Sequence, residues 1–284
     1  MPQHTAPSQQ ASPERPSRRP LLIWSIVGVV AVVAVVVGLT TFLGSGSDTP
    51  AGGSSNAVAD GATDSAGEVL LASTTHTTID AAPADQQADE GTDGLVVHPI
   101  RETPVHESPG GRAIARMETT QLGDTWLPVI AEQPGWVQVL LPSKPNGSTG
   151  WLRADDLERA RTPYVIEVHL GSMTLELIRD GDVVEEWTVG IGKESAPTPT
   201  GRTFLLGAFT DENQDYSPVI LPLGAHSPTH DTFGGGPGTV AIHTWPTDDV
   251  YGTASSDGCI RVPQDALDQL SEVPLGTLVM IDEE

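Results

Sequence analysis

Cysteine is almost absent from this chain of 284 residues, in which Cys259 is the only one. A single thiol excludes an internal disulfide bond and a metal site with several thiolate ligands. Three interpretations remain: a buried inert side chain, a residue without a role, or a reactive thiol. The sequence around Cys259 must decide between them.

Basic and aromatic residues are also scarce. Lys and Arg number 14 against 38 Asp and Glu, and the formal net charge of −24 argues against a nucleic-acid partner. Aromatic residues make up 5% of the chain, whereas Gly and Pro number 30 and 24. This composition is typical of a loop-rich, mainly β protein with a disordered portion.

One long hydrophobic run is present, "LLIWSIVGVVAVVAVVVGLTTFL" at residues 21–43, and it contains no charged residue. As a helix it would extend about 34 Å, enough to cross a hydrocarbon core of about 30 Å. The alternative is a cleaved signal peptide, whose apolar region is shorter, about 7–15 residues, and ends at a small-residue cleavage site. We therefore predict an uncleaved, single-pass transmembrane helix over residues 21–43.

The flanking residues predict the orientation of this helix. Residues 1–20 form a polar tail with Arg15, Arg18 and Arg19, and acidic residues follow the run. Because positive charge favours the cytoplasmic side, we expect a cytoplasmic N-terminus and a cell-membrane protein whose remainder lies outside. Residues 44–94 hold nine Asp or Glu and no Lys or Arg, which predicts a disordered acidic linker.

Residues 95–161 show short strands separated by turn residues. In "GWVQVLLPSKPNGSTGWL", apolar Val137 and Val139 alternate with polar residues, and Pro, Asn and Gly then mark a turn. This pattern resembles the bacterial SH3-like module, which implies a small β-barrel domain over residues 95–161. The three tryptophans of this region fit core positions better than a ligand-stacking surface: Trp126, Trp136 and Trp151.

Residues 162–284 predict a second, mainly β domain. Residues 164–170 alternate between apolar and polar side chains, and the next segment predicts a hairpin with Asp180-Gly181 as its two-residue turn. "TFLLGAF" and "GTLVMID" predict further strands. "PQDALDQLSEV" predicts one helix that begins near Pro263.

The residues around Cys259 are those that an activated nucleophile needs. A thiol reacts as thiolate, which requires a nearby base or positive charge and partial exposure. His243 ends the apolar run of "VAIHTWP", and Cys259 follows the loop "SSDG", so a strand end and a loop end can meet as base and nucleophile. Gly258 allows a sharp turn and backbone N–H groups aimed at an oxyanion. Arg261 shares a strand face with Cys259 and can hold a substrate carboxylate, support the thiolate, or pair with one of the many acids.

The combination "IHTWP…SSDGCIRV" resembles the signature of the L,D-transpeptidases, which cross-link peptides in bacterial peptidoglycan. "PTPTGRTF" at 197–204 and "FGGGPGTVAIH" at 233–243 are also similar to segments usual in that family. The resemblance covers about 120 residues. It implies the following roles: nucleophile for Cys259, base for His243, loop shaping for Ser256 and Gly258, orientation of His243 by the backbone of Thr244, and a trailing polar position for Arg261.

The chain departs from the family pattern at two places. Asp257 stands where many members have His, and a carboxylate beside a thiol raises its pKa. "HTWP" replaces the commoner continuation "HG", so we expect a narrower or differently shaped mouth of the site.

The resemblance implies an acyl transfer without metal or other cofactor. Cys259 would take an acyl group from a donor stem peptide of peptidoglycan and pass it to the side-chain amine of an acceptor stem, outside the membrane and facing the cell wall. It also implies acylation by carbapenem β-lactams. The alternatives are an L,D-carboxypeptidase in which water attacks, a catalytically impaired scaffold that binds the wall through the SH3-like module, and a redox-sensing thiol.

Three histidines invite a metal interpretation. "HSPTH" places His226 and His230 at a spacing that suits one helical face, with His243 further on. Pro228 and the nearby glycines predict a loop instead, so we expect no metal here. "FGGGPG" lacks the Lys-Ser/Thr of a phosphate loop and fits a flap beside the substrate better.

Overall fold

The computed structural model describes residues 69–233 and 236–284. The predicted cytoplasmic tail, the predicted transmembrane helix and the linker up to residue 68 lie outside the described residues. Within the described ranges, no helix combines the length and the apolar character needed to cross a membrane. These residues all belong to one compact unit, and they are mainly β, as the composition predicts.

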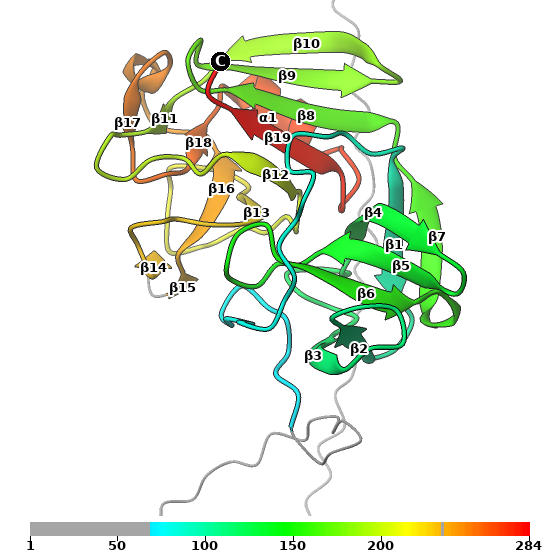
Figure 1. Ribbon diagram of the computed structural model, residues 1–284. Helices are drawn as coiled ribbons and strands as arrows, with labels where there is room; N and C mark the ends of the chain where they lie inside the picture. The colour runs from blue at the N-terminus through cyan, green and yellow to red at the C-terminus, as the bar shows by residue number, and fades with distance from the viewer. Residues whose placement is uncertain (1–68, 234–235) are drawn as a thin grey trace, which may run out of the picture. The chain divides into compact units, whose positions relative to one another are not determined.

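Residues 95–161 form one antiparallel sheet of seven strands in the order β3-β2-β6-β5-β4-β1-β7 (Figure 1). Val137 and Val139 are fully buried, because alternate side chains of a strand point to the same face. The SH3-like class of this sheet stays a prediction. Its strands are β1 (Leu95–Pro99), β2 (Thr103–His106), β3 (Ala113–Met117), β4 (Leu127–Gln133), β5 (Trp136–Leu140), β6 (Thr149–Arg153) and β7 (Leu157–Arg161), with a 3₁₀ turn η1 (Ala154–Asp156) before β7.

The three tryptophans of this sheet do not all lie in its core. Trp151 is buried, whereas Trp126 and Trp136 are half-buried. The Trp126 ring lies 5.3 Å from that of His98, and Trp136 packs edge-on against His106 at 4.9 Å between centroids. Trp136 is the first residue of β5, whereas Trp126 directly precedes β4. The prediction of a core position therefore holds only for Trp151.

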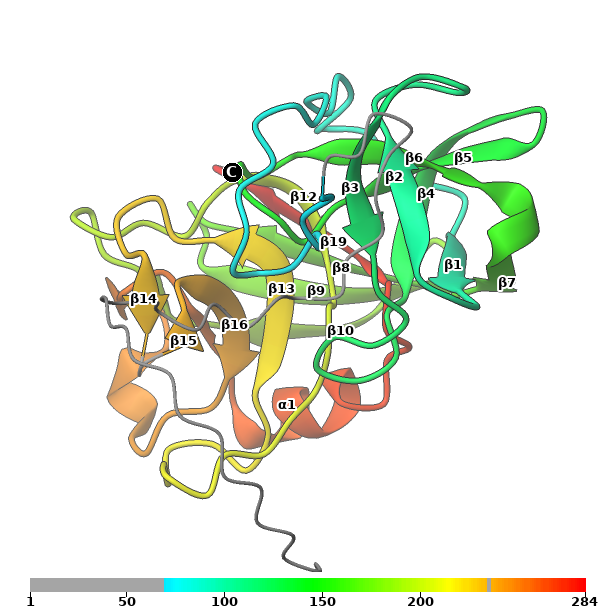
Figure 2. The ribbon, with the colours of Figure 1, turned by 90° about the horizontal axis from the view of Figure 1, so that it is seen from below.

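Residues 164–282 form a second group of sheets. A five-stranded sheet has the order β10-β9-β8-β19-β12, and a three-stranded sheet has the order β13-β16-β18; Figure 2 shows β13 and β16 side by side. Two pairs, β11 with β17 and β14 with β15, complete the group. The strands are β8 (Tyr164–His169), β9 (Thr174–Arg179), β10 (Asp182–Thr188), β11 (Ile191–Gly192), β12 (Gly201–Phe204), β13 (Leu221–His226), β14 (Thr232–Phe233), β15 (Gly236–Pro237), β16 (Thr239–His243), β17 (Ala254–Ser256), β18 (Ile260–Arg261) and β19 (Leu278–Asp282), with a 3₁₀ turn η2 (Asp248–Val250).

Two local predictions are confirmed in this group. Between β9 and β10, Asp180 and Gly181 have φ of 54° and 90°, the two positive values that a type I′ turn requires. Helix α1 (Gln264–Leu270) begins directly after Pro263 and buries its apolar face. That face packs with the apolar residues of the five- and three-stranded sheets.

The second group of strands has a hydrophobic core of its own, and the core of the seven-stranded sheet extends into that group. Phe204 of β12, Leu206 and Leu278 of β19 pack in the same cluster as the buried residues of the seven-stranded sheet. Phe204 and Leu206 are fully buried. The two predicted domains are therefore joined by apolar packing as well as by the chain.

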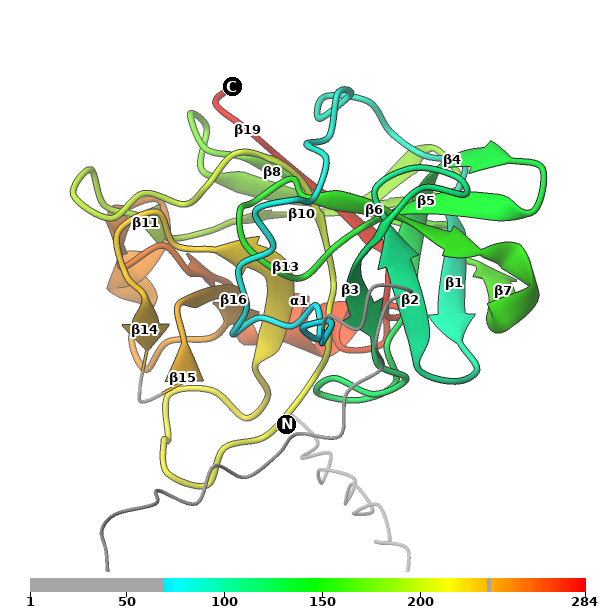
Figure 3. The same cartoon turned by 60° about the horizontal axis from the view of Figure 1, so that its bottom comes forward.

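Residues 69–94 differ from the predicted disordered linker (cyan in Figure 3). They form isolated β-bridges with the seven-stranded sheet and its loops, pairing Ala72 with Arg116, Thr78 with Lys144 and Ala84 with Ser148. Acidic, low-hydrophobicity composition predicted disorder, but the few apolar residues of this segment, such as Ile79, are buried against the sheet. We call residues 69–94 the strap.

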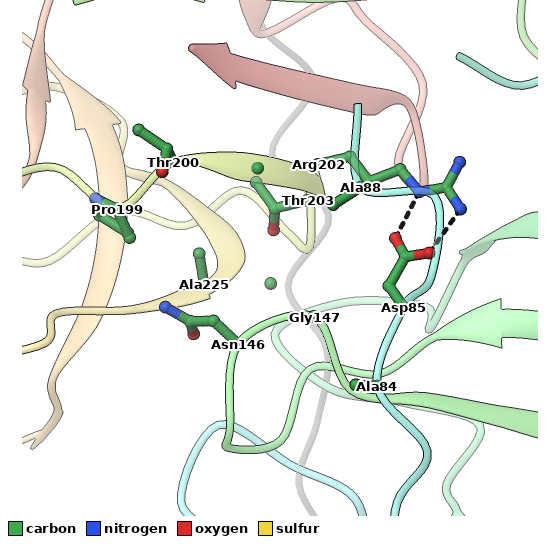
Figure 4. Close-up of a pocket in the computed structure, with 12 residues that line it drawn as sticks. Ala84, Asp85, Ala88, Asn146, Gly147, Pro199, Thr200, Arg202, Thr203 and Ala225 are labelled. Carbon is green, nitrogen blue, oxygen red and sulfur yellow. Dashed lines mark hydrogen bonds and ion pairs between the residues drawn. The ribbon is translucent and has the colours of Figure 1, made fainter. Parts of the chain in front are cut away.

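A buried ion pair joins the strap to β12. The carboxylate of Asp85 accepts two hydrogen bonds from the guanidinium of Arg202, at 2.5 and 2.7 Å, and Figure 4 shows the two side chains facing each other. The side chains are only 2% and 3% exposed. Arg202 Nη1 also donates to the carbonyl of Glu90 at 2.8 Å. Both charges are satisfied, which a buried pair requires.

Candidate active site

The pairing of β16 with β18 places the predicted site residues on one face. The two strands are parallel, with Ile242 opposite Ile260 and His243 opposite Arg261. Ile242 and Ile260 are fully buried in the core. By alternation, His243, Arg261 and Cys259, which directly precedes β18, are directed to the opposite face. The sequence-predicted nucleophile and base thus become diagonal neighbours across two strands.

That face lines a cavity of about 560 Å³. Its volume lies in the range of sites that bind small molecules. Its lining residues are Thr75, His76, Leu122, Phe209, Asp211, Tyr216, Ile220, Pro222, Phe233, Gly236, Pro237, Thr239, Ala241, His243, Trp245, Ser256, Asp257, Cys259 and Arg261.

Cys259 is partly exposed at this cavity. Burial raises the pKa of its thiol above the ordinary value, although the backbone of Ala241 and the positive charge of Arg261 act in the opposite direction. A nearby carboxylate, Asp257, contributes to the rise only weakly. The thiol is therefore neutral at neutral pH, and it needs a base to react as thiolate.

His243 is buried and has a defined tautomer. Its Nδ1 lies 2.7 Å from the carbonyl oxygen of Thr244, which can only accept, so Nδ1 carries the proton and Nε2 keeps a lone pair. Burial lowers the pKa of His243 to about 4, and the charge of Arg261 acts in the same direction. The imidazole is thus a neutral base at neutral pH. Thr244 makes the backbone contact that the family resemblance implies for it.

The loop before Cys259 is held by Ser256. Ser256 Oγ donates to the carbonyl of Cys259 at 2.6 Å and accepts from the N–H of Gly258 at 3.1 Å. Gly258 has φ of +115°, which disfavours any residue with a Cβ. The N–H of Gly258 is used within the loop, and the expectation that Gly258 lets backbone N–H groups face an oxyanion stays a prediction.

Asp257 has a partner that sequence reasoning missed. Lys193 Nζ lies 2.5 Å from its carboxylate, and this hydrogen-bonded ammonium lowers the pKa of Asp257. The pair is half exposed, so solvent screens it. Asp257 thus stands at the cavity as the charged partner of Lys193.

Arg261 lies over the ring of Trp245, with Cζ 3.8 Å from the ring centroid. Its Nη1 donates to Ser255 Oγ at 3.2 Å, whereas its buried Nε has no partner among the described residues. Within the described ranges, Arg261 forms no ion pair, so the interpretation as a partner for an acid is not supported. The guanidinium keeps its charge at the cavity wall.

Other residues of the site were not found from the sequence. The Tyr216 ring lies 4.9 Å from His243 and 5.5 Å from Trp245, and Ser217 Oγ accepts from the N–H of Thr244 at 3.0 Å. Thr198 Oγ1 donates to the carbonyl of Gly258 at 2.9 Å. Thr198 belongs to "PTPTGRTF", which the family resemblance had marked, whereas no sequence signal marked Tyr216 or Ser217.

The three histidines considered as metal ligands have different surroundings. His226 Nε2 lies 2.8 Å from the carbonyl of Pro142, and His230 stacks on Phe233. His243 lies in the cavity beside Tyr216. Among the described residues, these three do not form a group with metal-ligand spacing.

Comparison with known proteins indicates a family for the second group of strands. Residues 163–281 match the family model of the L,D-transpeptidase catalytic domain, YkuD. The chain is also 26% identical over 167 residues to YkuD of Bacillus subtilis (strain 168), whose name gives it provisionally as an L,D-transpeptidase. That match covers 56% of this chain and 94% of the relative. These matches support an L,D-transpeptidase-type catalytic domain over residues 163–281.

Solved structures give partial likenesses. The catalytic domain of the E. faecium L,D-transpeptidase acylated by ertapenem is 21% identical and covers 43% of this chain and 99% of its own, with a TM-score of 0.33. An L,D-transpeptidase from Mycobacterium tuberculosis H37Rv is 14% identical and covers 55% of this chain and 93% of its own, with a TM-score of 0.36. Both scores are too low to establish a common fold.

Proposed function

We propose that the chain is a peptidoglycan L,D-transpeptidase that works through a thioester on Cys259. One observation carries the proposal: Cys259 and His243 lie on one face of the β16–β18 pair and line one cavity. The family match over residues 163–281 supports the same assignment. A cysteine with a neighbouring base is the arrangement that nucleophilic acyl transfer needs.

The first half of the reaction forms the thioester. The thiol proton of Cys259 passes to Nε2 of His243 while the sulfur attacks the carbonyl carbon of the third residue of a donor tetrapeptide stem. The bond from that carbon to the nitrogen of the terminal D-alanine then breaks, and the imidazolium donates its proton to the leaving amine. No direct thiol–imidazole hydrogen bond joins the two groups in the described structure, which is common before substrate binds.

The second half transfers the acyl group. A side-chain amine of an acceptor stem attacks the thioester, His243 accepts its proton, and the carbon–sulfur bond breaks to release the cross-link between two third residues. The proton then returns to the sulfur. If water replaces the amine, the product is that of an L,D-carboxypeptidase. Arg261 supports the transient thiolate by its charge at the cavity wall.

The experiment is intact-mass analysis of the full-length protein after incubation with a tetrapeptide stem, and separately with a carbapenem. We expect a covalent adduct on Cys259, no adduct in Cys259→Ala, and adduct formation slowed by about 10²-fold or more in His243→Ala. His98→Gln, a histidine of the seven-stranded sheet outside the cavity, is the matched control and should react normally. If the wild type forms no adduct with the tetrapeptide stem and none with the carbapenem, the proposed enzymatic function is refuted and a wall-binding scaffold is favoured.

A further inference from the structure

The cavity around Cys259 has a wall that does not come from the catalytic strands. Thr75 and His76 of the strap line it, and so does Leu122 from the loop between β3 and β4. All three residues lie outside the matched range 163–281. The site is thus completed by parts of the chain that precede the catalytic domain.

The strap is held firmly where it meets the cavity. The N–H of Ser73 donates to the carbonyl of Arg116 at 2.8 Å, and the N–H of Ile79 donates to that of Lys144 at 2.9 Å, so bonds flank Thr75 and His76 on both sides. Ser73 Oγ lies 2.9 Å from Ser143 Oγ in the interior. Thr75 is buried, whereas His76 is exposed at the cavity. These contacts give the wall a fixed position.

Leu122 is an unusual residue in this wall. It is 46% exposed and has φ of +51°, a left-handed conformation that costs free energy for a bulky side chain. Its loop is tied to the strap by Gln121, whose Nε2 donates to the carbonyl of Ser73 at 2.8 Å. The loop also packs closely on Gly207, where an added Cβ would lie 2.7 Å from the Leu122 carbonyl oxygen. A strained, exposed leucine held at the edge of a reactive cavity indicates a role in binding.

We propose that Leu122 and His76 are specificity-determining residues that bind the peptide substrate of Cys259. Leu122 offers an apolar contact to the aliphatic part of a stem-peptide side chain. The His76 ring offers a hydrogen bond to polar groups of the same peptide. This inference rests on the proposed function, because a cross-linking reaction brings two peptides to one thiol, and Leu122 and His76 extend the cavity wall that can contact them.

The experiment compares the peptide reaction with a reaction that needs only the thiol. Full-length wild type, Leu122→Asn and His76→Ala are assayed for kcat/KM with a tetrapeptide donor and an amine acceptor, and for the rate of Cys259 alkylation by iodoacetamide. Asn is chosen because it tolerates a positive φ. The control is Leu71→Asn, an exposed leucine of the strap that does not line the cavity.

We expect kcat/KM to fall about three- to tenfold in Leu122→Asn, since a leucine that is already half exposed contributes only part of its full transfer energy. The loss should lie mainly in KM, Leu122→Met should restore most of it, and alkylation should be unchanged. Unaltered kcat/KM in both cavity variants, or an equal loss in alkylation, would overturn the inference while leaving the proposed function intact. A wild type that is alkylated but never turns over the peptide would overturn both.

Discussion

At the scale of residues, the site is a pair of neutral groups rather than a preformed ion pair. Burial acts on both side chains in the direction that disfavours charge, which raises the pKa of the Cys259 thiol and lowers that of the His243 imidazole. In the proposed reaction, the thiolate would therefore form as the proton moves to His243 during attack. The carbonyl of Thr244 orients the His243 ring, and the Ser256 side chain holds the backbone carbonyl of Cys259.

This arrangement predicts an unusual pH dependence. If neutral His243 is the base, kcat/KM for the stem peptide should hold nearly constant from pH 7 to about pH 5 and fall as the pH approaches about 4, where the folded-state imidazole takes up a proton. A histidine with an ordinary pKa would give a fall near pH 6.5. The measurement is the pH profile of kcat/KM, and an acid limb near pH 6.5 would contradict the predicted environment of His243.

The same lowered pKa bears on stability, which provides the control for that profile. The unfolded chain protonates His243 near pH 6.5, whereas the folded chain resists protonation until about pH 4. The stability linked to neutral His243 is present above pH 6.5 and is lost as the pH falls toward 4. Circular dichroism over the same range therefore separates loss of the base from loss of the fold.

At the scale of elements, short-range patterns predicted much of the catalytic domain. The Asp180-Gly181 hairpin and the helix after Pro263 follow from turn chemistry and periodicity, both of which are local. The pairing of β16 with β18 brings His243 beside Arg261. The local pattern indicated only that a strand end and a loop end can meet, and the family resemblance then implied which residues act together. The strap could not be predicted, because its order comes from Asp85 meeting Arg202, more than a hundred residues away in the chain.

The ion pair between the strap and β12 gives a prediction at this scale. Asp85→Asn leaves the Arg202 guanidinium buried without its counter-charge, so we expect the free energy of unfolding to fall by about 3–5 kcal/mol. The double variant Asp85→Leu with Arg202→Met should lose less free energy of unfolding than the sum of the losses in Asp85→Leu alone and Arg202→Met alone. The reason is that no unpaired charge remains in the double variant. Urea denaturation measures these changes. Asp80→Asn, an exposed acid of the strap, should change stability by less than about 0.5 kcal/mol, and an equally small effect of Asp85→Asn would argue against a structural ion pair.

At the scale of the whole molecule, the described residues have two hydrophobic cores, and one of them crosses the predicted domain boundary. The prediction of separate domains at residues 95–161 and 162–284 rests on a change of pattern along the chain, and nothing in that pattern shows side chains such as Phe204 packing with the seven-stranded sheet. The wall of the cavity crosses the same boundary. The apolar packing and the cavity wall thus both combine residues that the sequence pattern assigned to separate domains.

A core that crosses this boundary predicts that the two groups of strands unfold together. Phe204 is fully buried, so Phe204→Ala should lower the free energy of unfolding by about 3–5 kcal/mol. Because its ring packs in the cluster of the seven-stranded sheet while its backbone belongs to β12, native-state hydrogen exchange should quicken in β4 and β5 as well as in β8 and β9. Val183→Ala, at a residue that is 52% exposed on β10, should leave both regions unchanged. Faster exchange confined to β8 and β9 would mean that the two groups of strands are independent folding units despite the packing of Phe204 between them.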